Sequence, residues 1–351
     1  MSAKLLVAAL RAPSSVGSLD ADGWDALIAA ARAESLIGSL AYRVADQPLP
    51  ERVRLLLAEA RADASQRQRA ALWEAEMARR ALAPLGIAPI LLKGTAFAAA
   101  GLAAAEGRSI GDLDILVPRE RLTEVERALL AAGWEWVKED PYDDDYYRRW
   151  MHELPPLIHR ERDRMIDVHH TILPLTHRRR PDAAALIADS VALPSGLRLL
   201  SPADMVVHAA AHLIADGDLA GGLRNLWDID RLLRSFRAEH GHEFDVELRE
   251  RAREHDLVAP VALALRLAQA LFDTPIDPVL AGRAAPADRW FRRRLLARNG
   301  WGQSTRPLSR QAFYVRSHWL RMPPLMLARH LWTKSRRPAP GAQAEARRSG
   351  R

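Results

Sequence analysis

Apolar residues recur every three or four positions between residues 19 and 80, as Trp24, Leu27 and Ile28 illustrate. This is the period of a helix that buries one face. Glycine and proline are scarce in the same stretch, so few residues interrupt the pattern. We therefore expect residues 1 to 80 to form an N-terminal helical segment.

The pattern changes after Gly86, where apolar residues follow one another without interruption. The run from Ile87 to Leu92 predicts a short buried strand that ends at Lys93. Residues 112 to 117 alternate at first between acidic and apolar positions, up to Pro118. Such alternation indicates a second strand whose two faces have different surroundings.

Further strand signals follow a helix predicted for residues 119 to 132, which Gly133 ends. Residues 133 to 137 predict a third strand. Residues 157 to 160 and 165 to 169 predict a hairpin that turns at residues 161 to 164. Between them, residues 142 to 149 are acidic and aromatic and are expected to form a loop.

Beyond Pro181 the chain is expected to be helical again. Ser201 is a suitable N-cap, Pro202 suits the first helical position, and Asp204 suits the first turn because an acid there favours the helix dipole. Further helices are expected at residues 222–236, 246–272 and 289–298, with a last one that holds Trp319 to Trp332.

The predicted fold class is α+β, with a small mixed β-sheet core flanked by helices and a helical C-terminal region. The expected parts are an N-terminal helical segment (1–80), a core that carries the sheet (81–180), a helical C-terminal domain (181–334) and a disordered basic tail (335–351). The tail is rich in Pro, Gly, Ala and Arg, and so offers little apolar surface to repay ordering.

Composition narrows the chemistry. The chain has 351 residues, of which 48% are hydrophobic and 27% charged, the balance of a soluble globular protein. It has no cysteine, which excludes disulfides, thiolate metal ligands and cysteine nucleophiles. The apolar run from Leu5 to Leu10 is far shorter than a membrane span and is expected to be the first helix. We therefore expect a cytoplasmic protein.

The charge is distributed unevenly. Residues 289 to 351 hold 16 Lys or Arg and the single acid Glu345, which gives this part a net charge of +15. Since the whole chain has a net charge of +7, the first 288 residues carry −8 (7 − 15). A basic C-terminal tail on an acidic body is suited to an anionic partner, either nucleic acid, membrane surface or acidic protein. Solvated helix faces rich in arginine account for the same pattern equally well.

Paired aspartates give the strongest chemical signal, and five pairs have the spacing Asp-x-Asp: Asp20/Asp22, Asp112/Asp114, Asp143/Asp145, Asp216/Asp218 and Asp228/Asp230. The pair at 112 and 114 lies on the predicted strand, with apolar residues between and after. Its two carboxylates therefore project from one face of the strand. A divalent cation would remove the repulsion between them.

The order of motifs resembles the DNA polymerase β-like nucleotidyltransferase superfamily, and within it a bacterial family of uncharacterised nucleotidyltransferases. The motifs that carry the resemblance are Leu91-Leu92-Lys93-Gly94, Arg108, Asp112-Leu113-Asp114-Ile115-Leu116-Val117, Gly133-Trp134, Ile166-Asp167-Val168-His169, Ser201-Pro202-Ala203-Asp204, His208, His212 and Leu226-Trp227-Asp228-Ile229. They extend over roughly residues 20 to 240, and their combined spacing is more specific than any one of them.

The resemblance implies an enzyme that moves a nucleoside monophosphate from an NTP to an acceptor, with Mg²⁺ or Mn²⁺ as cofactor. Asp112, Asp114 and Asp167 match the aspartates that bind the two ions and carry catalysis. Asp167 is also placed to help deprotonate an acceptor hydroxyl. The active site is expected between the sheet and the helical C-terminal region.

Nucleotide contacts are expected from Lys93, Gly94, Thr95, Arg108 and His169. Gly94-Thr95 stands where the superfamily usually has Gly-Ser or Gly-Gly, so the phosphate contacts are expected to differ. His169 shares a face with the third aspartate by the two-residue period of a strand.

Some assignments stay open in the sequence. Asp163 and Glu153 are alternatives for the third carboxylate. His208 and His212 have the spacing of a metal pair on a helix, but a structural role with Asp228 as hydrogen-bond partner fits better. The tryptophans at 227, 319 and 332 are expected to be packing residues.

Two other function classes remain possible from the sequence. One is an inactive relative that binds a nucleotide or a partner in the same cleft. The other is a basic nucleic-acid-binding protein that acts through its C-terminal tail. If the chain is an enzyme, the sequence leaves its acceptor open among small molecules, sugars, proteins and RNA.

Overall fold

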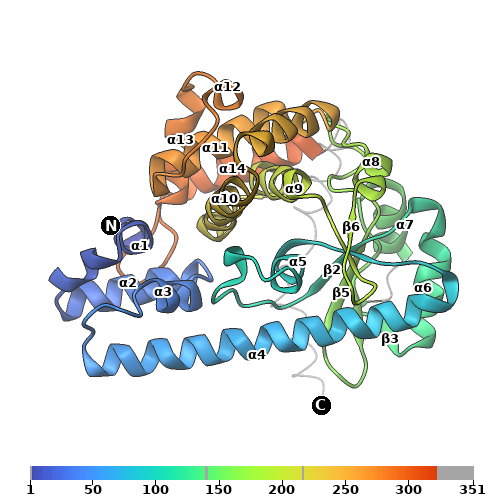
Figure 1. Ribbon diagram of the computed structural model, residues 1–351, viewed down its shortest axis with the longest axis horizontal. Coiled ribbons are helices and arrows are strands. Elements are labelled where there is room, and N and C mark those ends of the chain that lie inside the picture. Colours follow the sequence, from blue (N-terminus) through green and yellow to red (C-terminus); the bar gives the residue numbers. More distant parts are fainter. Residues whose placement is uncertain (1, 139–140, 216, 322–351) are drawn as a thin grey trace, which may run out of the picture.

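A computed structural model describes residues 2–138, 141–215 and 217–321. Its N-terminal part is helical as predicted: α1 (Ser2–Arg11), η1 (Pro13–Ser18), α2 (Ala21–Ala33), α3 (Ile37–Arg43) and α4 (Glu51–Leu82). Asp20 caps α2 by accepting a hydrogen bond of 2.8 Å from the backbone N–H of Gly23. The 32 residues of α4 make a helix of about 48 Å. It runs along one side of the molecule, from α3 to the sheet (Figure 1).

The central sheet has seven described strands in the order β3-β4-β5-β2-β1-β7-β6. They are β1 (Ile90–Leu91), β2 (Leu113–Leu116), β3 (Trp134–Trp136), β4 (Leu157–His159), β5 (Met165–His169), β6 (Val191–Ala192) and β7 (Arg198–Leu199). β2 pairs with β5 in parallel, as β1 does with β7, and the other described pairs are antiparallel. The predicted α+β class with a mixed sheet is therefore confirmed.

Short helices lie before and between the first five strands. These are η2 (Ala83–Leu85), α5 (Lys93–Ala99), η3 (Ala103–Ala105), η4 (Arg119–Arg121), α6 (Leu122–Ala131) and α7 (Pro141–Trp150). The loop expected at residues 142 to 149 was wrong, because this stretch belongs to α7. Proline at the first helical position and acids in the first turn are helix-start signals that outweigh the polar composition.

The stretch after Pro181 also differs from the prediction, which had no strands there. A short helix α8 (Ala183–Ala188) is followed by β6 and β7, which lengthen the sheet beyond β1. Leu193 and Leu197 close the hairpin with a backbone hydrogen bond of 2.8 Å. Strands of two residues are too short to show an alternation of apolar and polar positions, although the proline and glycine between them indicate a turn.

The C-terminal region is helical, with α9 (Pro202–Ala215), α10 (Gly222–Glu254), α11 (Val258–Phe272), α12 (Pro278–Ala281), α13 (Pro286–Leu295) and α14 (Pro307–Arg321). The expected break between residues 236 and 246 is found at Gly241, whose φ of 60° and ψ of −138° are not helical, so α10 consists of two helical stretches that meet at a kink. The chain breaks again at residues 255 to 257, which were expected to be helical. Asp256 adopts a left-handed backbone there (φ 53°), which ends a helix. Trp332 and the predicted tail at 335–351 lie outside the described residues.

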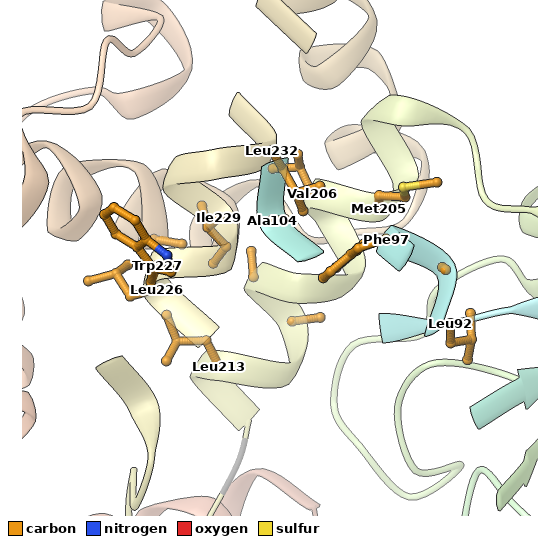
Figure 2. Close-up of a cluster of buried hydrophobic side chains, with 14 of the residues drawn as sticks. Leu92, Phe97, Ala104, Met205, Val206, Leu213, Leu226, Trp227, Ile229 and Leu232 are labelled. Atoms are coloured by element: carbon orange, nitrogen blue, oxygen red, sulfur yellow. The ribbon is translucent and has the colours of Figure 1, made fainter. Parts of the chain in front are cut away.

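One continuous core joins the sheet to the C-terminal helices. Figure 2 shows Phe97 of α5 beside Met205 and Val206 of α9, with Leu92, the residue before α5, nearer the strands. Trp227 is buried in α10 and packs edge-on against Phe272 at 5.2 Å. Its predicted packing role is confirmed. The helical region thus packs directly on the part of the chain that carries β1 and β2.

Trp319 differs from the expectation of a packing residue. It is 43% exposed, and the guanidinium of Arg178 lies 4.7 Å from its ring centroid. None of the described helices is long and apolar enough to cross a membrane.

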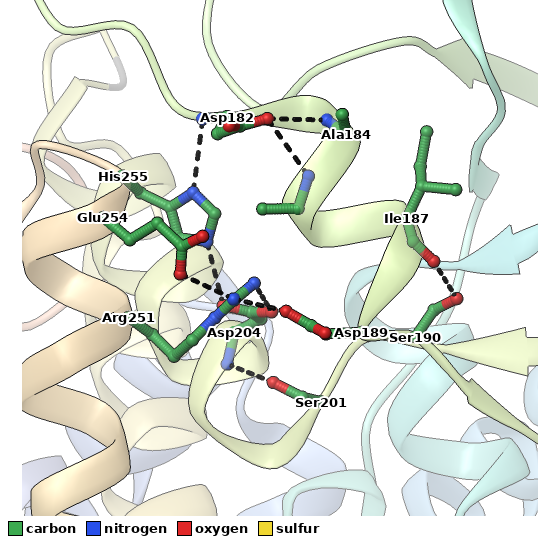
Figure 3. A network of polar contacts seen from close by, with 11 residues as sticks. Asp182, Ala184, Ile187, Asp189, Ser190, Ser201, Asp204, Arg251, Glu254 and His255 are labelled. Carbon is green, nitrogen blue, oxygen red and sulfur yellow. Dashed lines mark hydrogen bonds and ion pairs between the residues drawn. The ribbon is translucent and has the colours of Figure 1, made fainter.

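A buried ionic network fixes the start of α9 to α10 (Figure 3). Ser201 caps α9 as predicted, with the Asp204 backbone N–H 3.2 Å from its hydroxyl. The Asp204 carboxylate accepts hydrogen bonds of 2.8 and 2.7 Å from Arg251 and one of 3.1 Å from His255. Burial opposes ionisation of Asp204, but these donors outweigh it and lower its pKa. The network therefore depends on an ionised carboxylate in the core.

Replacing Asp204 by alanine should destabilise the fold strongly. Arg251 would stay buried without its bidentate partner, which costs about 3–5 kcal/mol. Asp189→Ala is a matched control, because Asp189 also contacts Arg251, at 2.5 Å, but is 54% exposed. Its loss should cost about 1 kcal/mol or less. Urea unfolding followed by circular dichroism measures both, and equal costs would contradict this account.

Candidate active site

Three aspartates meet on one face of the sheet. β2 and β5 pair in parallel with Asp114 opposite Asp167, so the strand spacing of about 4.8 Å sets their backbones side by side. Asp112 lies two residues before Asp114 and therefore faces the same way. One carboxylate oxygen from each of the three lies within 4.8 Å of the others. The structure thus brings together the three carboxylates expected from the sequence.

The apolar residues between these aspartates explain why the carboxylates emerge on one side. Leu113 and Ile115 flank Asp114 on β2, while Ile166 and Val168 flank Asp167 on β5, and all four are buried. Turning them outward by a one-residue slip would expose the core. Burial of the apolar face thereby fixes the acidic face.

Asp114 is the most enclosed of the three carboxylates. The Lys93 ammonium lies 2.6 Å from its Oδ1, and Nε2 of His169 lies 3.0 Å from the same oxygen. Burial opposes ionisation, but the Lys93 charge and the His169 hydrogen bond outweigh it and lower the pKa of Asp114. Asp114 is therefore an anion at neutral pH.

Lys93 reaches Asp114 through a strained backbone. The N–H of Leu92 donates to the carbonyl of Asp114 at 3.0 Å, and Lys93 follows with a left-handed φ of 49°. A residue with a side chain in this region costs on the order of 1 kcal/mol or more, which the surrounding structure must repay. This backbone conformation places the Lys93 ammonium beside the carboxylates.

Asp167 differs from Asp114 in its protonation. Burial, followed by the charges of Asp114 and Glu153, raises the pKa of Asp167 to about 7. Asp112, in contrast, is exposed to solvent. A cation among the three carboxylates would relieve the repulsion that Asp167 feels, so these residues fit a hard divalent ion with oxygen ligands.

Neither alternative for the third carboxylate takes that place. Asp163 lies in the hairpin turn, is exposed and has a left-handed φ of 52°. Glu153 forms an isolated bridge with His169 and lies on the other side of that imidazole, 3.4 Å from its Nδ1. Within the part of the chain that the structure describes, Glu153 groups with His152 and His169. The sequence reading missed His152, since nothing in its neighbourhood resembled a motif.

The expected nucleotide contacts lie in two groups. His169 is at the aspartate cluster and buried. Arg108 instead pairs with Asp228 of α10, which also accepts from Arg224 at 2.6 Å. Gly94 lies against Arg108, where a Cβ would come 2.4 Å from Nε, so a side chain at position 94 would displace Arg108. Thr95 is buried next to it.

His208 and His212 line a small cavity between α5 and α9 rather than a metal site. Asp228, their expected partner, pairs with the arginines, and Asn225 lies 3.3 Å from Nδ1 of His212. Burial lowers the pKa of His208 well below its ordinary value. The cavity, which also adjoins Lys93, measures about 30 Å³ and so has room for about one or two water molecules. The space between the sheet and the helices is therefore narrow at this point.

Comparison with known proteins identifies the family. A family model described as "Uncharacterised nucleotidyltransferase" matches residues 20–273, which confirms the resemblance inferred from the motifs. The crystal structure of JHP933 from Helicobacter pylori is similar to this chain, with 13% sequence identity and a TM-score of 0.31. The match covers 73% of this chain and 94% of JHP933. No curated protein matches.

The raised pKa of Asp167 predicts how stability depends on pH. Without metal, folding favours the protonated carboxyl, so this group makes the protein less stable as pH rises from about 4, its unfolded pKa, to about 7. Asp167→Asn removes this effect. At pH 8 the variant should be more stable than the parent by roughly 2–4 kcal/mol, a difference that vanishes below about pH 4.

Urea unfolding in EDTA at several pH values measures this difference. The exposed Asp46→Asn is the control and should show none of it. A gain that is the same at pH 5 and pH 8 would contradict the assigned cause.

Proposed function

Since the chain belongs to the uncharacterised nucleotidyltransferase family, we propose that it moves a nucleoside monophosphate from an NTP to an acceptor oxygen, with Mg²⁺ or Mn²⁺. The observation that carries the proposal is the gathering of Asp112, Asp114 and Asp167 within 4.8 Å. All three offer carboxylate oxygens, the ligands that Mg²⁺ prefers. A divalent cation bound there supplies positive charge where the phosphate and the oxygens around it become more negative.

The proposed reaction is a displacement at the α-phosphorus. The acceptor oxygen forms a bond to that phosphorus, the bond to the bridging oxygen breaks, and pyrophosphate leaves with the electron pair. The acceptor hydroxyl loses its proton to a carboxylate oxygen of Asp167, which lies in the same cluster as Asp112 and Asp114. An acceptor phosphate needs no such step.

Lys93 and His169 have supporting roles in this proposal. Both contact Oδ1 of Asp114, so they orient that carboxylate and offset part of the negative charge of the cluster. Arg108 acts as a positioning residue, because its ion pair with Asp228 holds the turn at Gly94 against α10. The cavity beside Lys93 is too small for a nucleotide. The NTP therefore approaches from the side on which Asp112 is exposed.

Replacing Asp112 or Asp114 by asparagine should reduce transfer by about 100-fold or more, since each change removes a charged ligand that stabilises the transition state. The measurement is label transfer from each α-³²P-labelled NTP with Mg²⁺ or Mn²⁺, together with pyrophosphate release. Asp163→Asn is the control, because Asp163 is exposed in a turn that asparagine also tolerates. Near-normal activity in either active-site variant would overturn the assignment.

Binding of NTP with Mn²⁺ should raise the melting temperature by a few degrees, because a ligand at 100 times its Kd stabilises the native state by about 2.7 kcal/mol. Asp112→Asn should lose most of this shift. Differential scanning fluorimetry in the presence and absence of EDTA measures it. If the melting temperature of the parent protein does not change at saturating NTP, the result would favour the alternative that the chain is an inactive relative which binds a partner.

A further inference from the structure

A second group of metal-ligating side chains lies directly behind the aspartate cluster. His152, Glu153 and His169 each place one ligand atom within 4.8 Å of the others. Residues 152 to 154 run along β5, where backbone hydrogen bonds tie Leu154 to Val168 and His170 to His152, each at 2.9 Å. Two chain segments with regular backbone pairing therefore hold the three side chains together.

The distances between the ligand atoms suit a bound cation better than hydrogen bonds. Oε2 of Glu153 lies 3.4 Å from Nδ1 of His169 and 3.6 Å from Nε2 of His152. Metal bonds of about 2.1 Å at tetrahedral angles separate neighbouring ligands by about 3.4 Å. The two distances to Glu153 are thus close to those of a tetrahedral site, and the two histidine ligand atoms lie within 4.8 Å of each other.

An unpartnered nitrogen points to the same place. His169 is 2% exposed, and its Nδ1 has no hydrogen-bond partner among the described residues. A buried polar atom without a partner is costly, so such an atom calls for a ligand that the protein atoms alone do not supply. The carboxylate of Glu153 lies 3.4 Å from Nδ1 of His169 and also faces His152.

The other ring nitrogen of His169 is arranged as in known metal sites. Nε2 lies 3.0 Å from Oδ1 of Asp114, and since an ionised carboxylate only accepts, Nε2–H donates to it. In the neutral imidazole, Nδ1 is then the nitrogen with a lone pair for an ion. Histidine ligands commonly donate their second N–H to a carboxylate, which fixes both the tautomer and the orientation of the ring. Asp114 takes this position for His169.

We propose that His152, Glu153 and His169 bind one borderline divalent cation of the Zn²⁺ class, with a fourth position open to solvent or a ligand. Two imidazole nitrogens and one carboxylate oxygen favour such ions, whereas the all-oxygen aspartate cluster favours Mg²⁺. The ion proposed here takes no part in the bond-making steps proposed above, although its ligand His169 also contacts Asp114. An ion there fixes His169, and through its Nε2–H also orients Asp114.

Cobalt(II) is the probe for this site, because it replaces Zn²⁺ and absorbs visible light when bound by nitrogen and oxygen ligands. The full chain, freed of metal with EDTA and dialysed, is titrated with Co²⁺. One equivalent should bind to the parent protein with a new absorption band. His152→Gln and Glu153→Gln should each weaken this binding by about 10- to 100-fold or more.

Two controls locate the ion. Asp112→Asn should keep the cobalt band, because Asp112 belongs to the other cluster. His242→Gln should keep it too, because His242 is a surface histidine with a side chain that is 79% exposed. The side chains of His152 and Glu153 are 20% and 19% exposed, so both variants should fold. Melting curves without metal check this, and Zn²⁺ should raise the melting temperature of the parent but not of these variants.

Three results would overturn the proposal: a parent protein that binds no stoichiometric cobalt, a band that survives both His152→Gln and Glu153→Gln, or a band that disappears in Asp112→Asn. The last result would assign the ion to the aspartate cluster. No assay here depends on NTP turnover, so a failure of this proposal is distinguishable from a failure of the transferase proposal.

Discussion

The parallel pairing of β2 with β5 is the constraint on which the rest of the site depends. Its register places Asp114 opposite Asp167, and the sheet gives neither strand freedom to slip, because the residues between the aspartates are buried in the core. Hydrophobic burial therefore holds like charges together against their repulsion. The surroundings then distribute that cost unequally, since Lys93 and His169 stabilise the anion of Asp114 while burial and its neighbours favour a proton on Asp167.

The helical region contributes to the site through buried ion pairs and not only through coverage. Asp228 of α10 binds both Arg108, next to the Gly94 turn, and Arg224, whose guanidinium also reaches the Ser39 hydroxyl at 2.8 Å. Three parts of the chain meet in this contact: the N-terminal helices, the sheet and α10. Since a buried ion pair loses much of its value when one partner moves, the turn that carries Lys93 is tied to the position of α10.

Much of the fold followed from periodicity, because the long helices and the strands β2, β4 and β5 each bury one face that leaves its period in the sequence. The structure differed where local signals were short or in conflict. The strands β6 and β7 have two residues each, and α7 is polar enough to suggest a loop. The aspartate cluster was predictable since spacing on a strand fixes which side chains share a face. Partners far apart in sequence, such as Arg108 with Asp228 and His152 with His169, depend on tertiary contacts that no local pattern encodes.

The contacts of His169 connect the two clusters, and they could not be predicted from the sequence. Its position on β5 follows from the strand period, but its chemistry depends on two groups that reach it from different elements. Nε2 faces Asp114 on β2, and Nδ1 faces Glu153 on the segment before β4. An imidazole has one proton to place on two nitrogens when neutral, so whatever occupies one side decides what the other side donates or accepts. The two clusters therefore meet at a single ring, so the proposed ion at Nδ1 would also act on the Asp114 carboxylate of the proposed transfer site.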